Sequence, residues 1–304
     1  MSHPGYPPPP AGWGPPVADP GPIPLRPLGV GEVLGAGFGV VRRHLTLLGP
    51  VAVLLAALSS AAMLGILAGT GSLTGFAEGS WVNDVFSGTR TTLPGGMYLA
   101  TGASTVISVV GAIALSGLAA ACAGVDAMGR HTVRGALAER LAGRVPALLA
   151  ASVLVGVAVS IGLVLLVVPG VLIFLSWSAA APVVAMERSG PGAALQRSAV
   201  LTRGHRGRIL GATVLIVLIA FGIETVVSSV VLSAAASLTP IGSVVLAEVV
   251  RALVSAVTMS WVGAVIALLY VDIRVRTENL GPALRAFAAA DRSRRAAGPA
   301  LGQA

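Results

Sequence analysis

Charged residues divide the chain into long apolar stretches separated by short polar and basic segments. Uncharged runs extend over 45–75, 97–125 and 145–186, and two further apolar stretches, 209–239 and 241–270, contain only three charged residues. A helix needs about 20 apolar residues to cross the hydrocarbon core of a bilayer. The pattern predicts transmembrane helices at 47–68, 98–122, 146–168, 171–186, 209–236 and 243–270.

The apolar run at 145–186 is 42 residues long, which is too long for one crossing and suits two. Pro169-Gly170 lies inside it, and a Pro-Gly pair is a strong helix breaker, so the sequence predicts a tight hairpin there. The second arm, 171–186, is short and contains Pro182. We expect this arm to be tilted, kinked or incompletely spanning.

The composition is that of a membrane protein. Hydrophobic residues make up 55% of the 304 positions and charged residues 11%, whereas a soluble domain has about 25% charged residues. The mean hydropathy is +0.88. A surface with so few charges suits lipid, so the expected fold class is an all-α membrane protein, with about six transmembrane helices arranged in three hairpins.

The basic residues are all arginine, 20 in number. With six spans and a cytoplasmic N-terminus, 18 of these 20 arginines fall on the cytoplasmic side, in agreement with the positive-inside rule. The sequence therefore predicts a multi-pass protein of the bacterial cytoplasmic membrane with both termini in the cytoplasm. Boundary arginines are expected to contact anionic lipid headgroups; the candidates are Arg42, Arg43, Arg130, Arg134, Arg203, Arg206, Arg208, Arg274 and Arg276.

The net charge of +8 does not indicate nucleic-acid binding. Each basic segment adjoins a predicted span, and aromatic residues, on which bases would stack, are only 4% of the chain. The expected partners are therefore membrane lipids, with a protein partner or a second copy of the chain as alternatives.

The two ends of the chain differ from its middle. Residues 1–27 contain 11 of the 20 prolines and lack the basic and apolar regions of a signal peptide, so we expect a disordered cytoplasmic tail. Residues 28–280 form the predicted six-helix domain. Residues 281–304 are predicted to form a basic cytoplasmic C-terminal tail.

Three segments on the predicted cytoplasmic side share a plan: a short candidate helix, a basic junction and an apolar hairpin. They begin near Gly31, Arg134 and Gly192. An interfacial helix is therefore expected before each hairpin, and either internal duplication or shared boundary composition accounts for the repeat. In the first segment one helical face is apolar; it carries Val30, Val33, Leu34, Gly37, Phe38 and Val41.

Two sets of glycines have the four-residue spacing that permits close helix packing. They are Gly31, Gly35 and Gly39 in the first candidate helix, and Gly65 and Gly69 in the first span. With 39 glycines in the chain this spacing is common by chance, so it is a weak indication of a contact.

Glu224, Glu248 and Arg251 lie inside the last two apolar stretches, in the predicted outer half of the membrane. Ionisable groups at that depth are costly and are usually paired or functional. Glu248 and Arg251 are three residues apart and share a helix face. A structural ion pair and a proton or substrate site are both open interpretations.

The sequence contains no recognisable catalytic or metal-binding arrangement. The four histidines have no metal-ligand spacing, and Cys122 is the single cysteine, placed as a small apolar residue at the end of a span. Without lysine, neither a P-loop nor a Schiff base is available. We expect no cofactor and no enzymatic activity.

Several strings, in their order along the chain, resemble the membrane domain of the glycerophosphoryl diester phosphodiesterase family, over about residues 22–285. They are PLRPL at 24–28, GEVL at 31–34, VVPG at 167–170, AAPVV at 180–184, ALQRS at 194–198, LTRG at 201–204 and YVDIRVRTE at 270–278. In some members of that family such a domain is fused to a soluble phosphodiesterase barrel of about 250 residues. The 34 residues after Tyr270 are too few for a barrel, so the resemblance implies the membrane part without the catalyst.

Two functional hypotheses follow. The first is a non-catalytic scaffold or accessory factor whose basic cytoplasmic face contacts anionic lipids or a partner protein. The second is a transporter or channel for a small or lipid-derived solute that uses Glu224, Glu248 and Arg251.

Overall fold

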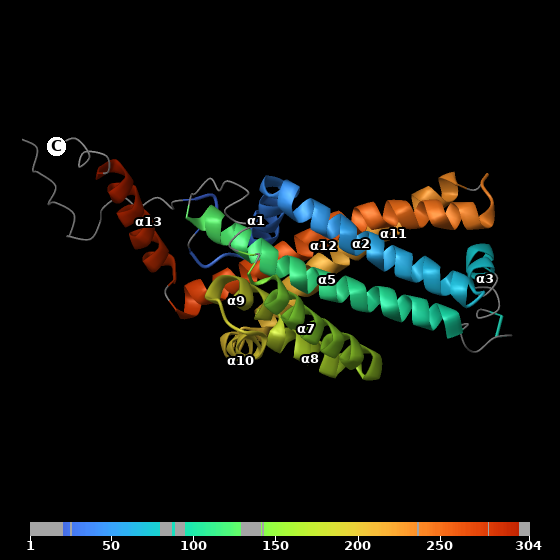
Figure 1. Cartoon of the computed structure of the whole chain (residues 1–304), viewed down its shortest axis with the longest axis horizontal. Coiled ribbons are helices and arrows are strands. Elements are labelled where there is room, and N and C mark those ends of the chain that lie inside the picture. Colours follow the sequence, from blue (N-terminus) through green and yellow to red (C-terminus); the bar gives the residue numbers. More distant parts are fainter. Residues whose placement is uncertain are drawn as a thin grey trace, which may run out of the picture.

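The structure is a computed structural model that describes residues 21–24, 26–79, 87–88, 95–128, 141, 143–235, 237–278 and 280–297. The described residues are almost entirely helical and contain no strand (Figure 1). The helices are α1 (Val30–Arg43), α2 (Leu45–Gly69), α3 (Leu73–Glu78), α5 (Gly95–Ala127), α7 (Val145–Leu165), α8 (Val167–Trp177), α9 (Ala180–Glu187), α10 (Pro191–Leu201), α11 (Arg206–Ala234), α12 (Pro240–Thr277) and α13 (Leu280–Ala297).

The structure confirms the predicted fold class. Six described helical segments are long and apolar enough to cross a membrane, if α8 and α9 are counted as one segment, Val167–Glu187. The other five are α2, α5, α7, α11 and α12. The six segments follow one another as three antiparallel pairs, α2 with α5, α7 with α8–α9, and α11 with α12 (Figure 1).

The long helix α12 lies at the centre of the bundle. It packs against α2 and α5, which also pack against each other, and it carries α1 and α11 on its other sides. Residues 264–273 of α12 are all buried, because other helices surround this part of it. By contrast, α11 contacts mainly α12, so most of its apolar surface is exposed and suited to lipid.

The hairpin within the 42-residue run turns earlier than predicted. The chain leaves the helix at Leu166, where φ is −158° and ψ is 130°, and Pro169 lies in the first turn of α8. Proline is tolerated there, because the first N–H groups of a helix have no intrahelical partner. The prediction that Pro169-Gly170 forms the turn is therefore wrong, and the fourth span begins at Val167 rather than at residue 171.

Gly170 serves close packing instead of the turn. A Cβ atom at this position would lie 2.5 Å from the backbone nitrogen of Leu163 and 2.8 Å from the carbonyl carbon of Gly162, both on α7. The second arm is also interrupted, as α8 ends at Trp177 and α9 begins at Ala180. Pro182 lies within the first turn of α9, where its missing N–H again costs little.

The helices extend beyond several predicted span boundaries. The second span, predicted at 98–122, is part of the 33-residue helix α5, and the sixth, predicted at 243–270, is part of the 38-residue helix α12. Both continue through charged residues at the same end of the bundle, where carboxylates pair with arginines. Residues 281–297 of the predicted C-terminal tail lie in α13, in keeping with the high helix propensity of alanine and arginine.

Two of the three predicted interfacial helices are described, α1 and α10. Helix α1 buries most of the predicted apolar face against α12, and Trp261 of α12 donates its indole N–H to the carbonyl oxygen of Leu34 at 2.9 Å. Phe38 is half exposed. The remaining candidate helix, near Arg134, lies outside the described residues, as do Arg130 and the tail 1–20.

The spaced glycines of the sequence do not make the closest contacts. A Cβ atom added at Gly31, Gly35, Gly65 or Gly69 would meet nothing within 4 Å. The tight helix approaches use other glycines instead; these are Gly117, Gly156, Gly162, Gly170 and Gly263.

Candidate functional site

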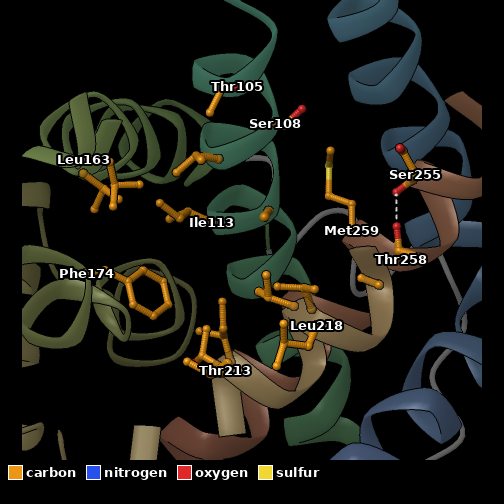
Figure 2. A pocket seen from close by; sticks show the side chains of 18 of the residues that line it. Thr105, Ser108, Ile113, Leu163, Phe174, Thr213, Leu218, Ser255, Thr258 and Met259 are labelled. Carbon is orange, nitrogen blue, oxygen red and sulfur yellow. Dashed lines mark hydrogen bonds between the residues drawn. The ribbon is translucent and has the colours of Figure 1, made fainter. Parts of the chain in front are cut away.

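A cavity of about 610 Å³ lies within the bundle, between α5, α7, α8, α11 and α12. Most of its wall is apolar, and Figure 2 shows Leu163 of α7, Ile113 of α5, Phe174 of α8 and Leu218 of α11 around it. The wall contributed by α11 is exposed, since Val217 is 48% and Leu218 61% accessible. The cavity is therefore open beside α11 rather than sealed inside the protein.

Polar side chains gather at one end of this cavity. Thr105 and Ser108 of α5 and Ser255 and Thr258 of α12 are seen there in Figure 2. The lining also includes Ser104, Glu224 and Arg251. Toward the other end the lining consists mainly of apolar side chains, among them Leu210, Phe174, Val262 and Ile266.

The polar end lies far from the arginine-rich end of the bundle, which is defined here by Arg43, Arg208, Arg274 and Arg276. Glu224 follows Arg208 by 16 residues on α11, which is about 24 Å of helix. Ser255 precedes Asp272 by 17 residues on α12, about 26 Å. These distances are most of the roughly 30 Å thickness of a hydrocarbon core, so the polar end lies toward the opposite end of the bundle.

Glu224 is positioned by two hydroxyl groups of the neighbouring helix. Ser255 donates a hydrogen bond to Oε1 of Glu224 at 2.9 Å, and Thr258 donates to the same oxygen at 2.8 Å. Ser255 and Thr258 are three residues apart, so they lie on one face of α12. Within the described part of the chain, Glu224 forms no ion pair and its Oε2 accepts no hydrogen bond.

Glu248 and Arg251 form the ion pair that their spacing predicts. Arg251 donates from Nε to both carboxylate oxygens of Glu248, at 3.1 and 3.0 Å, and from Nη2 to Oε2 at 2.6 Å. It also donates to Ser60 of α2 at 3.3 Å. The Glu248 side chain is only 11% exposed and the Arg251 side chain 28%, so the pair is largely buried between the helices.

Replacing Arg251 by methionine is therefore expected to destabilise the protein by about 2 kcal/mol, because it leaves the Glu248 carboxylate without a counter-charge. The double replacement of Arg251 by methionine and Glu248 by glutamine should recover part of this loss. Thermal unfolding of the three proteins in the same detergent measures the coupling. Additive losses in the double variant would contradict a stabilising pair.

A second polar cluster fastens the arginine-rich end. The carboxylate of Asp272 on α12 has no exposed surface and accepts hydrogen bonds from Nε of Arg208 and Nε of Arg276, both at 2.9 Å. It also accepts the backbone N–H of Leu28 at 2.8 Å, and both arginines donate to the carbonyl oxygen of Leu28. This cluster holds the segment before α1 against α11 and α12.

Two further clusters are found at the same end. In the first, Glu187 of α9 and Glu278 after α12 pair with Arg197 of α10 and Arg274 of α12, and Tyr270 donates to Glu187 at 2.9 Å. Partial burial raises the pKa of Glu278, but hydrogen bonds from the two arginines outweigh it and lower this pKa below its usual value.

In the other cluster, Asp126 of α5 pairs with Arg43, at 2.8 Å, and hydrogen-bonds the ring of His44, at 2.9 Å. Arg43 ends α1, and His44 links α1 to α2. Asp126 therefore ties the junction between these two helices to α5.

The predicted lipid-contacting arginines divide into two groups. Arg43, Arg208, Arg274 and Arg276 pair with carboxylates of the chain itself, which makes them structural. Arg42, Arg203 and Arg206 are exposed and pair with no carboxylate of the described residues, and Arg206 donates to Ser176 at 3.1 Å. Arg130 and Arg134 lie outside the described residues.

The three intramembrane charges of the sequence meet at one place. Glu224 and Arg251 both line the cavity, and Glu248 holds Arg251 from outside the lining. The hydroxyl groups that complete the polar end were missed by sequence reasoning; they belong to Ser104, Thr105, Ser108, Ser255 and Thr258. Hydroxyl residues are common in apolar helices, so only the Ser255–Thr258 spacing was a usable signal.

The described residues contain no group of three or more histidine, cysteine, aspartate or glutamate side chains that could hold a metal ion. Cys122 is buried, and burial in an apolar helix leaves its thiol inert. No protein-family model, curated protein or solved structure matched the chain.

Proposed function

We propose that this multi-pass membrane protein is a non-catalytic carrier that binds a lipid-derived amphiphile in the cavity between α5, α8, α11 and α12. The observation that carries the proposal is the polarity of the cavity, whose walls are mostly apolar and whose charged groups and most of whose hydroxyl groups gather at one end, with Thr213 of α11 lying toward the other (Figure 2). An amphiphile has the same division between its headgroup and its hydrocarbon chain. Of the two hypotheses from the sequence, this favours the transporter that uses Glu224 and Arg251.

The size of the cavity suits one such molecule. Its volume of about 610 Å³ falls within the 300–1,000 Å³ range of small-molecule sites. The lining of α11 extends from Leu210 to Glu224, 14 residues or about 21 Å. One leaflet of the hydrocarbon core is about 15 Å thick, so the cavity accommodates an extended chain together with its headgroup.

The open side of the cavity supports entry from the bilayer. The exposed α11 residues at its edge, such as Val217 and Leu218, would face lipid directly. A chain can therefore move from the membrane into the cavity without crossing water, while its headgroup travels along the interface near Glu224.

This proposal predicts that a photoreactive amphiphile labels the buried part of the lining. The probe is a 12-carbon chain with a mid-chain diazirine, added to proteoliposomes. Labelling of Ile113 and Ile266, which are 1% and 4% exposed, is compared by mass spectrometry with labelling of Leu54, which is 68% exposed on α2. Val217→Trp should lower the ratio of cavity to reference labelling several-fold, because the bulky indole narrows the open side of the cavity.

The matched control is Val226→Trp, on the same helix and 62% exposed but outside the lining. It should leave the labelling ratio unchanged. Labelling of Leu54 alone, or an equal effect of the two tryptophans, would overturn the proposal.

A scaffold role at the membrane surface is the second candidate function. It is supported by three exposed arginines at or next to helix ends, which are Arg42, Arg203 and Arg206. Arginines in such positions attract anionic headgroups. It would place the arginine-rich end in the cytoplasm of a bacterial cell, as the positive-inside rule predicts. Both proposals include the hypothesis that this chain is related to the membrane domain of the glycerophosphoryl diester phosphodiesterase family.

A further inference from the structure

The charges at the polar end of the cavity do not balance. Arg251 is paired with Glu248 through three hydrogen bonds from Nε and Nη2, of 2.6–3.1 Å, so this pair contributes little net charge to the cavity. Glu224 is the other charged residue of the lining. The hydroxyl groups around it are neutral, and ionised Glu224 therefore gives the polar end a net negative charge.

The carboxylate of Glu224 is held in a fixed position with one oxygen available. Ser255 and Thr258 both donate to Oε1, which orients the carboxylate plane. Oε2 accepts nothing from the described residues and belongs to a side chain that lines the cavity. Because the described residues supply no second donor, a ligand or water in the cavity can donate to this oxygen.

A cationic donor is the group that this arrangement recognises best. A carboxylate in surroundings of low polarity costs free energy unless it is paired. Hydrogen bonds in which a partner is charged are about twice as strong as hydrogen bonds between neutral groups. An ammonium group carries the missing charge and up to three N–H donors. A carboxylate or phosphate headgroup would instead meet a like charge at Glu224.

We propose that the cavity selects amphiphiles with an ammonium headgroup, which binds Oε2 of Glu224 while the hydrocarbon chain extends toward Leu210 and Ile266. The neighbouring hydroxyl groups of Ser104, Thr105 and Ser108 give further polar contacts to the headgroup. This inference rests on the proposed function, since it names the ligand class of the same cavity.

The test compares three photoreactive probes with the same 12-carbon chain and an ammonium, a hydroxyl or a carboxylate headgroup. Cavity labelling at Ile113 and Ile266 is measured in proteoliposomes and divided by labelling of Leu54, which corrects for partition into the bilayer. The ammonium probe should label the cavity about tenfold or more above the hydroxyl probe at equal concentration. The carboxylate probe should label it least.

The decisive variant is Glu224→Gln, which keeps the shape of the side chain and removes the charge. It should abolish the preference for the ammonium probe while leaving labelling by the hydroxyl probe unchanged. Glu224→Asp should retain part of the preference and serves if glutamine disturbs folding. Glu78→Gln is the matched control, because Glu78 on α3 is exposed and outside the lining, and it should behave as the unmodified protein.

The outcomes separate this inference from the proposed function. Equal cavity labelling by all three probes, or an ammonium preference that is undiminished in Glu224→Gln or in Glu224→Asp, would overturn the inference and leave an amphiphile carrier without headgroup selection. Absence of cavity labelling by every probe would overturn the proposed function itself.

Discussion

Replacing Asp272 by alanine is expected to lower the free energy of unfolding by about 3–5 kcal/mol. The carboxylate of Asp272 has no exposed surface and pairs with Arg208 and Arg276. Its removal leaves two guanidinium groups without a counter-charge and the Leu28 N–H without an acceptor. Removing one member of a buried cluster is costly because the charges left behind remain desolvated.

The measurement is thermal unfolding of the purified protein in one detergent, followed by circular dichroism. Glu32→Ala provides the matched control, since Glu32 also accepts from an arginine and a backbone N–H, but at the exposed start of α1. It should leave the unfolding temperature nearly unchanged, because exposed ion pairs contribute little. Equal shifts for the two variants would contradict a structural role for the Asp272 cluster.

Replacing Gly170 by alanine is expected to destabilise the protein by about 1–3 kcal/mol, although alanine normally favours a helix. The added methyl group would lie 2.5 Å from the backbone nitrogen of Leu163, so it can be accommodated only if α7 and α8 move apart. Both Gly170 and Leu163 line the cavity, and cavity labelling should therefore change with stability.

Gly65→Ala is the corresponding control in α2. Nothing lies within 4 Å of a Cβ atom at Gly65, so the gain in helix propensity should stabilise the protein by about 0.5–1 kcal/mol. Both variants are compared by thermal unfolding under one set of conditions. The two alanines are expected to act in opposite directions, and stabilisation by both would show that the α7–α8 contact is looser than the structure indicates.

The location of the hairpin turn shows where sequence reasoning fails. Pro169-Gly170 has the composition of a turn, yet Pro169 is in the first turn of a helix and Gly170 faces α7. Proline, which lacks an N–H, and glycine, which lacks a side chain, suit a tight turn and the first turn of a closely packed helix equally well. The position of the neighbouring helix decides between these uses, and local sequence does not contain it.

Local sequence also did not distinguish the structural boundary arginines from those available to lipid. Their position along the chain is consistent with a lipid-facing role for all nine, but Arg208 and Arg276 are bound to Asp272, and Arg43 to Asp126. The acids concerned are up to 83 residues away in the sequence. Among the nine candidates, only Arg42, Arg203 and Arg206 are exposed and pair with no carboxylate of the described residues, so their charge is available for a lipid contact.

The sequence by itself determined the six apolar helices, because burial in lipid imposes a length and a composition on each span. It also determined the Glu248–Arg251 pair, since three residues of helix bring two side chains together. The tertiary structure alone decided that Glu224 and Arg251 line one cavity and that hydroxyl groups from α5 and α12 join them. These contacts join residues on different helices, and helix packing sets their geometry. Local patterns along the chain do not predict that geometry.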